Sequence, residues 1–133
     1  MFEINTSANF EAAHRLSNYD GKYNRIHGHN WKVNLKVQSN ELDEKSMVYD
    51  FTNLKKILEE FDHKTILKNT KENQELVKSF PSEWITWLNF EPTAEELAKY
   101  ICNKITSKIN LKLIQITIFE NEKSYAIFEQ TQK

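Results

Sequence analysis

A strict alternation of apolar and polar side chains runs through residues 29–38, whose sequence is HNWKVNLKVQ. The apolar members are Trp31, Val33, Leu35 and Val37, and the polar members are Lys32, Asn34, Lys36 and Gln38. Because successive side chains of a strand point to opposite faces of a sheet, this pattern predicts a half-buried β-strand. The chain must therefore build a sheet with one covered and one polar face.

Three further segments have the composition of strands. Residues 2–13 alternate in the same way, with room for a bulge near Ser7 and Ala8. Residues 111–119 alternate again, and residues 124–130 follow as a hairpin partner. The sequence thus predicts one strand pair near each end of the chain.

Two helices are predicted between these strand pairs. The first carries an apolar stripe and can be capped by Asp50 or Thr52. The stripe residues are Phe51, Leu54, Ile57, Leu58 and Phe61. The second begins at Thr93, with glutamates in its first turn where the helix dipole favours negative charge. Between them, residues 62–92 predict a short helix near 72–79 and a loop containing Pro81. The order is ββααββ, which is an α+β arrangement.

Size and charge narrow the class of protein. The chain of 133 residues predicts a single domain over residues 1–133. Its net charge is −1 and its basic residues are scattered, which argues against nucleic-acid and membrane partners. No apolar run approaches the roughly 18 residues of a membrane span. We expect a soluble cytoplasmic protein without an internal disulfide, since Cys102 is the single cysteine.

Three of the four histidines lie at the ends of the first strand pair. His27 and His29 flank Gly28, and in an extended segment positions i and i+2 share a face. If the two strands form an antiparallel hairpin, His14 reaches the same point. Three neutral imidazoles leave an open position, as in catalytic rather than structural zinc sites. The spacing alone is also compatible with plain strand histidines, and it does not distinguish zinc from iron, nickel or cobalt.

Two other groups could take part in chemistry. Asp62 and His63 place a carboxylate beside an imidazole, a pair that can move protons near neutral pH. The alternative is a solvated helix end. Glu120 closes a strand, where it could accept hydrogen bonds from a ligand or simply begin a turn.

The motifs in their chain order resemble one known family. The segments are FEAAHRL, HGHN, MVYDFTNLKK, DH and PTAEELAKYI, followed by a glutamate that closes a strand. Together they are similar to the 6-pyruvoyl-tetrahydropterin synthase and 6-carboxy-tetrahydropterin synthase family over essentially the whole chain. The resemblance implies the tunnelling fold, a four-stranded antiparallel sheet with two helices on one face. It also implies a homohexamer, a dimer of trimers with active sites at subunit interfaces.

The resemblance assigns roles to nine residues of this chain, of which Tyr23 is considered below. Its metal ligands would be His14, His27 and His29, holding Zn²⁺. Its proton-transfer pair would be Asp62 and His63, and its pterin-binding residues would be Glu120, Thr93 and Glu95. The implied substrate is 7,8-dihydroneopterin triphosphate, whose side-chain hydroxyls zinc would make more acidic.

One position departs from the family pattern. The family usually has a catalytic cysteine four residues before the first histidine of H-G-H, and here that residue is Tyr23. Tyr23 could act as an acid or base, or only pack and hydrogen-bond. Cys102 lies in the second predicted helix and is expected in the core. Other members have a glutamate at this site, but Glu11 is on the first strand and is not expected to substitute.

The matching site residues and the altered position Tyr23 together suggest three alternative functions. The first is a zinc-dependent carbon–oxygen lyase that gives a 6-carboxy or 6-pyruvoyl tetrahydropterin, the former feeding deazaguanine (queuosine-type) synthesis. The second is retro-aldol cleavage to 6-hydroxymethyl-dihydropterin. The third is a non-catalytic protein that binds a pterin and a metal, which is suggested by the missing cysteine.

Overall fold

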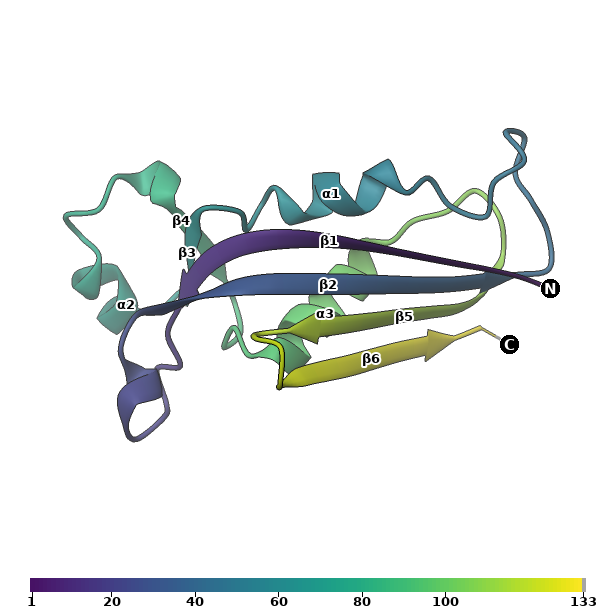
Figure 1. The fold of residues 1–133 in the computed structure, drawn as a ribbon. Coiled ribbons are helices and arrows are strands. Elements are labelled where there is room, and N and C mark those ends of the chain that lie inside the picture. The colour runs from purple at the N-terminus through teal and green to yellow at the C-terminus, as the bar shows by residue number, and fades with distance from the viewer. Residues whose placement is uncertain (133) are drawn as a thin grey trace.

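A six-stranded mixed sheet forms the body of the computed structural model, which describes residues 1–132 (Figure 1). The strand order is β4-β3-β1-β2-β5-β6. Their bounds are β1 Phe2–His14, β2 His27–Ser39, β3 Lys64–Lys68, β4 Ile85–Leu88, β5 Leu111–Phe119 and β6 Tyr125–Thr131. The strands β1, β2, β5 and β6 pair antiparallel, whereas β3 runs parallel to β1 and β4 runs parallel to β3. The α+β class is confirmed, but the expected four-stranded sheet has two additional strands.

The long strand pair β1–β2 follows the alternation seen in the sequence. On β2 the side chains of Trp31, Val33, Leu35 and Val37 are buried to within 1% exposure. Trp31 stacks on Phe10 of β1, with ring centroids 5.6 Å apart and planes 3° from parallel. The register is unbroken from Phe2 to His14, so the predicted bulge near Ser7 and Ala8 is wrong. The irregularity lies instead where β2 pairs with β5, between Gln38 and Ser39.

The α-helices are α1 (Thr52–Leu58), α2 (Lys71–Leu76) and α3 (Ala94–Lys104), and α2 corresponds to the short helix predicted near 72–79. In Figure 1, α1 runs along β1 and α3 lies behind β5. Buried side chains of α1 and α3 join one apolar cluster with β2, so both helices cover the same face of the sheet. That cluster includes Leu54, Leu58, Leu97, Ile101 and Cys102, and the core position expected for Cys102 is confirmed.

Polar side chains define where the helices begin. The Asp50 carboxylate accepts the N–H of Thr52 at 3.0 Å, and the Thr93 hydroxyl accepts the N–H of Glu96 at 3.1 Å. The Thr93 cap agrees with the sequence, whereas the N-cap residue of α1 is Phe51, which makes no side-chain cap, and Asp50 instead bonds Thr52 from the preceding turn. Phe51, however, is 51% exposed, because it precedes the first helical residue and does not face the sheet.

The connection between α1 and α3 contains structure that the sequence pattern did not show. Residues 62–92 form β3, α2, a 3₁₀ turn at Ser82–Trp84 and β4. The predicted helix near 72–79 is present but ends at Leu76. The strands β3 and β4 have only five and four residues, too few for a clear alternation, and they exist because β1 offers an edge for pairing. Among the described residues, no helix has the length and apolar composition needed to cross a bilayer.

A buried arginine ties this connection to the loop between β1 and β2. Arg15 is only 5% exposed. Its guanidinium donates to the backbone carbonyl of Asn24 at 2.6 Å and to the side-chain oxygen of that residue at 2.9 Å. It also donates to the side-chain oxygen of Asn73, which is fully buried, and to Glu72 at 2.7 Å. Arg15 therefore holds residues 22–24 of the loop against α2.

Replacing Arg15 with alanine should destabilise the protein by about 3 kcal/mol, because it leaves buried acceptors on Asn73 and Asn24 without a donor. Urea unfolding followed by circular dichroism measures this loss. Arg25→Ala is the matched control, since Arg25 lies in the same loop and is exposed. Equal unfolding midpoints for the two variants would contradict the role given to Arg15.

Candidate functional site

The three histidines His14, His27 and His29 meet at one end of the β1–β2 pair. His14 lies directly opposite His27, and Ala12 lies opposite His29, so the side chains share the helix-covered face. Their ring centroids are 4.6 to 5.2 Å apart. One nitrogen of each ring lies within 4.8 Å of the others, so the three residues could hold a metal ion. The hairpin geometry expected from the sequence is confirmed.

Hydrogen bonds orient two of these rings. The Nδ1 atom of His14 lies 2.7 Å from the carbonyl oxygen of Pro92, and Nδ1 of His27 lies 2.8 Å from that of Arg25. A carbonyl can only accept, so each Nδ1 carries the proton and each Nε2 presents a lone pair. In His29 the Nε2 atom is buried and has no hydrogen-bond partner among residues 1–132. Backbone carbonyls that fix the tautomer of histidines are the usual supports of a metal site, and the residues present fit one.

Burial favours the neutral imidazole at His14 and His29 by lowering the pKa of each. Burial is the main cause that lowers the pKa of His14 to about 4, with smaller contributions from His27 and His29. Burial also lowers the pKa of His29, although the Glu120 carboxylate opposes the shift. A metal ion binds the neutral imidazole, so the lowered pKa of His14 and His29 favours the state that can bind one.

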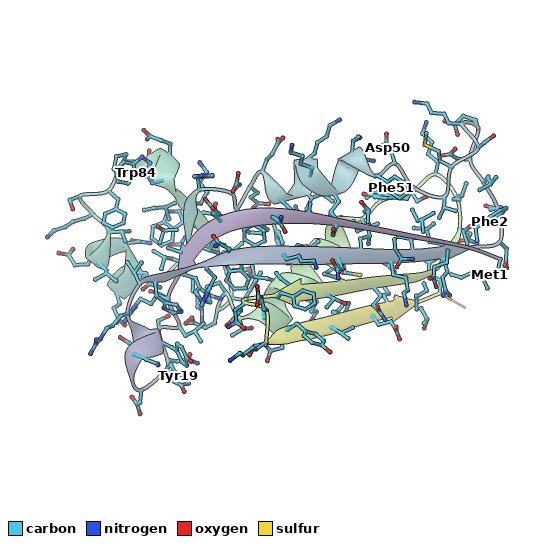
Figure 2. The ribbon with its side chains drawn as sticks, viewed as in Figure 1. Met1, Phe2, Tyr19, Asp50, Phe51 and Trp84 are labelled. Atoms are coloured by element: carbon cyan, nitrogen blue, oxygen red, sulfur yellow. The ribbon has the colours of Figure 1, made fainter. Side chains whose placement is uncertain are left out.

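Tyr23 lies beside the histidine cluster. It belongs to the 3₁₀ turn Lys22–Asn24, and its ring centroid is 5.6 Å from that of His27. On its other side it packs at 5.2 Å against Tyr19, which is labelled in Figure 2 on the loop after β1. The side chain is 41% exposed. Tyr23 thus packs against His27, one of the three candidate metal-binding residues.

Three candidate pterin-binding residues lie on the adjoining strand and helix. Glu120 follows β5 directly, and its Oε2 atom is 4.0 Å from Nε2 of His29. Glu95 and Glu120 both line a cavity of about 420 Å³ beside β6. The hydroxyl of Thr93 caps α3, as described above. Glu120 therefore lies next to His29, and Glu95 lines the same cavity as Glu120.

Asp62 and His63 form a close pair on the turn after α1. His63 has a positive φ of 60°, and its Nδ1 atom lies 3.1 Å from Oδ1 of Asp62. This unusual backbone conformation lets two neighbouring side chains converge, where neighbours in sequence often diverge. The Asp62 pKa is lowered, chiefly because its carboxylate accepts the backbone N–H of Glu11 at 3.0 Å.

The sequence patterns did not indicate Glu11 as a member of this group. Its Oε2 atom lies 3.4 Å from Nε2 of His63, and its carbonyl accepts the N–H of His63 at 2.6 Å. Because Glu11 alternates with Phe10 and Ala12, its side chain leaves β1 on the face opposite His14. The only signal in the sequence is a charged residue between two buried strand positions, which is common on any half-covered sheet.

One cavity adjoins both groups of residues. It has a volume of about 990 Å³, and its lining includes His29, Glu120, Asp62, His63 and Glu11. This volume lies at the upper end of the range of small-molecule sites. A potential metal ligand, carboxylates and an imidazole can therefore act on one bound molecule, by binding it and by moving its protons.

Comparison with known proteins identifies what the chain is similar to. The profile of the family described as 6-pyruvoyl tetrahydropterin synthase matches residues 3–131. A 6-carboxy-5,6,7,8-tetrahydropterin synthase of Haemophilus influenzae is 28% identical, covering 98% of this chain and all of the relative. The enzyme of the same name from Rickettsia bellii is 30% identical, covering 82% of this chain and 83% of the relative.

Solved structures share the fold. The 6-pyruvoyl tetrahydropterin synthase of Plasmodium vivax superposes with a TM-score of 0.73 at 20% identity, covering 98% of each chain. The 6-pyruvoyl tetrahydropterin synthase of Caenorhabditis elegans superposes with a TM-score of 0.62 at 27% identity, covering 99% of this chain and 96% of that one.

The neutral state of His14 predicts a pH dependence for the metal-free protein. The folded state holds the uncharged imidazole down to about pH 4, whereas the unfolded chain takes up the proton near pH 6.5. The free energy of unfolding should therefore fall by about 3 kcal/mol on this account between pH 6.5 and pH 4. Urea unfolding in the presence of a chelator measures it. His14→Gln should show a shallower decline over this range, and an identical slope would contradict the assignment.

Removal of one candidate ligand should abolish tight metal binding. We expect the wild-type protein to retain one equivalent of a divalent metal after dialysis, and His27→Ala to retain less than a tenth of that, because two imidazoles bind more weakly than three. Elemental analysis of dialysed protein gives the stoichiometry. His63→Ala is the matched control and should keep its metal. Stoichiometric metal in His27→Ala would show that the ligand set is different.

Proposed function

The chain belongs to the 6-pyruvoyl tetrahydropterin synthase family, and from this premise we propose that it is a zinc-dependent carbon–oxygen lyase acting on 7,8-dihydroneopterin triphosphate. The product would be a 6-carboxy- or 6-pyruvoyl-tetrahydropterin. Both relatives described above are named 6-carboxy-5,6,7,8-tetrahydropterin synthases, which favours the 6-carboxy product and a place in deazaguanine synthesis. The observation that carries the proposal is the family match over residues 3–131 together with the retained histidine cluster.

In this proposal the three histidines hold zinc on the helix-covered face of the sheet. Imidazole ligands suit zinc, and three of them leave a position open. Zinc held there supplies Lewis-acid polarisation that makes the hydroxyl groups of the substrate side chain more acidic. Trp31 packs edge-on against His14 and His29 at centroid distances of 5.0 and 5.3 Å. These contacts hold the two imidazole rings in place.

Glu120 would orient the pterin. A carboxylate can accept two parallel hydrogen bonds from the N–H edge of a pterin ring. The 4.0 Å between Glu120 and His29 places the anchored ring next to the metal ligands. Glu95 and Thr93, at the start of α3, would line the ring pocket from the opposite side. Asp62 and His63 would carry protons to and from the side chain of the substrate, since His63 is exposed and Asp62 is held in its ionised form.

Tyr23 occupies the position where the family usually has its catalytic cysteine. In this proposal Tyr23 is an aromatic support for His27, based on its ring contact. The same substitution favours a second candidate function, a protein that binds a pterin and a metal without turnover. A third candidate function is retro-aldol cleavage, which would be identified by 6-hydroxymethyl-dihydropterin as the product of the activity assay.

We also propose a cytoplasmic homohexamer built from two trimers. The support is the family resemblance and the exposed edge strand β6, where Tyr125 and Ile127 are 57% and 55% exposed. An uncovered edge of this kind can pair with the sheet of another subunit. Sedimentation equilibrium would give a mass six times that of the chain if the proposal is right.

The activity is tested with the zinc-loaded protein and 7,8-dihydroneopterin triphosphate, with products identified by mass. We expect a 6-carboxy or 6-pyruvoyl tetrahydropterin, and we expect Tyr23→Phe to keep kcat within about threefold, because a phenyl ring preserves the packing against His27. A loss of about 100-fold or more in Tyr23→Phe would instead assign the phenol to proton transfer. Tight pterin binding without any product would favour the non-catalytic function.

A further inference from the structure

We propose that Glu11 is a further catalytic residue, the carboxylate that exchanges protons directly with the substrate and passes them to the neighbouring pair His63 and Asp62. This proposal rests on the proposed lyase function and deepens it. It replaces the expectation from sequence that Glu11, being on the first strand, has no part in the chemistry.

The position of the His63 ring carries the proposal. Its Nδ1 atom lies 3.1 Å from Asp62 Oδ1, and its Nε2 atom lies 3.4 Å from Glu11 Oε2. Both ring nitrogens therefore face a carboxylate. The Glu11 carboxylate thus lies within reach of the unprotonated Nε2, and both side chains are exposed to a ligand.

Backbone contacts hold this arrangement in place without using the Glu11 side chain. The N–H of Glu11 donates to Asp62 at 3.0 Å, and the carbonyl of Glu11 accepts the N–H of His63 at 2.6 Å. Two bonds to one residue fix the turn against β1 and support the positive φ of His63. The turn thus stays docked if the side chain of Glu11 is changed.

Glu11 is open to a ligand. Its side chain is 63% exposed. It lines the cavity of about 990 Å³ described above and a second one of about 580 Å³, and both cavities also include His29 and His63 in their linings. Trp84, labelled in Figure 2, lies on the wall of the second cavity. Tyr23 is absent from the lining of both cavities among the residues that the structure describes.

The proton steps balance without any added reagent. The Glu11 carboxylate takes a proton from the substrate side chain, and the electron pair of the broken bond stays on the substrate. The resulting carboxylic acid passes its proton to the free Nε2 of His63, whose Nδ1–H faces Asp62. The proton then rests on an imidazolium between two carboxylates, which stabilise its charge. The reverse sequence returns a proton to another atom of the substrate.

The separation of 3.4 Å between Glu11 and His63 is long for a hydrogen bond. Catalytic hydrogen bonds are often long in the absence of substrate and shorten when it binds. Lys64 begins β3 next to this group, and its ammonium donates to the Glu83 carbonyl. It therefore has a partner outside the Glu11 and His63 pair.

Three variants test the proposal in the zinc-loaded protein. Glu11→Gln keeps the shape and removes the charge, and we expect kcat to fall about 100-fold or more while KM and zinc content stay within about threefold. Glu3→Gln is the matched control, since Glu3 lies on the same face of β1 but eight residues away, and its kcat should match the wild type. A kcat of Glu11→Gln within about threefold of the wild type would overturn the proposal.

Glu11→Ala gives a readout that a structural role would not produce. Truncation leaves space for a small carboxylate, so added formate should restore kcat in a saturable way while acetamide should not. No rescue by formate, together with a loss of kcat, would overturn the catalytic role. The lyase function is judged separately on the wild-type protein. No turnover of the pterin by the wild type would refute the lyase function and Glu11 with it, whereas an active wild type with an equally active Glu11→Gln would refute Glu11 alone.

Discussion

The antiparallel register between β1 and β2 is the constraint on which the site depends. It pairs thirteen residues without a break and sets His14 opposite His27 and Ala12 opposite His29. Because side chains alternate along a strand, a slip of one residue would send the histidines to the polar face and bury lysines instead. The apolar row of β2 and the stack of Phe10 on Trp31 oppose such a slip. The packing that builds the core therefore also brings together the three histidines of the candidate metal site.

The two faces of this strand pair carry different chemistry. On the helix-covered face His14 is buried, which lowers the pKa of its imidazole, and the Nδ1–H groups of His14 and His27 donate to backbone carbonyls. The open face carries Glu11, whose side chain is exposed. A ligand at the end of the strands can contact His29 and Glu11 together, since both line the same cavity. The candidate metal ligands and the Glu11 side chain thus leave the strand pair on opposite faces, and His29 and Glu11 adjoin one cavity.

Connections outside the central strands position the remaining groups. Arg15 directly follows His14, a candidate metal ligand, and ties the Asn24 turn to α2 through buried hydrogen bonds. The turn after α1 reverses at His63, whose left-handed backbone is stabilised by two bonds to β1. Each contact links residues far apart in the chain, nine to 58 positions for the Arg15 bonds and 51 for the bond between Glu11 and Asp62.

The sequence by itself determined the features that depend on local periodicity and capping. Alternation predicted the long strands, Thr93 predicted the start of α3, and the spacing of His27 and His29 predicted a shared face. Only the tertiary structure decided the short parallel strands β3 and β4, because five or four residues show no reliable period and gain their pairing from the edge of β1. It also decided the partner of His63, because a contact between Glu11 and a residue 52 positions later leaves no local pattern. The period of apolar residues predicts which face of a strand a side chain occupies. Only the tertiary fold decides which residues, distant in sequence, that side chain contacts.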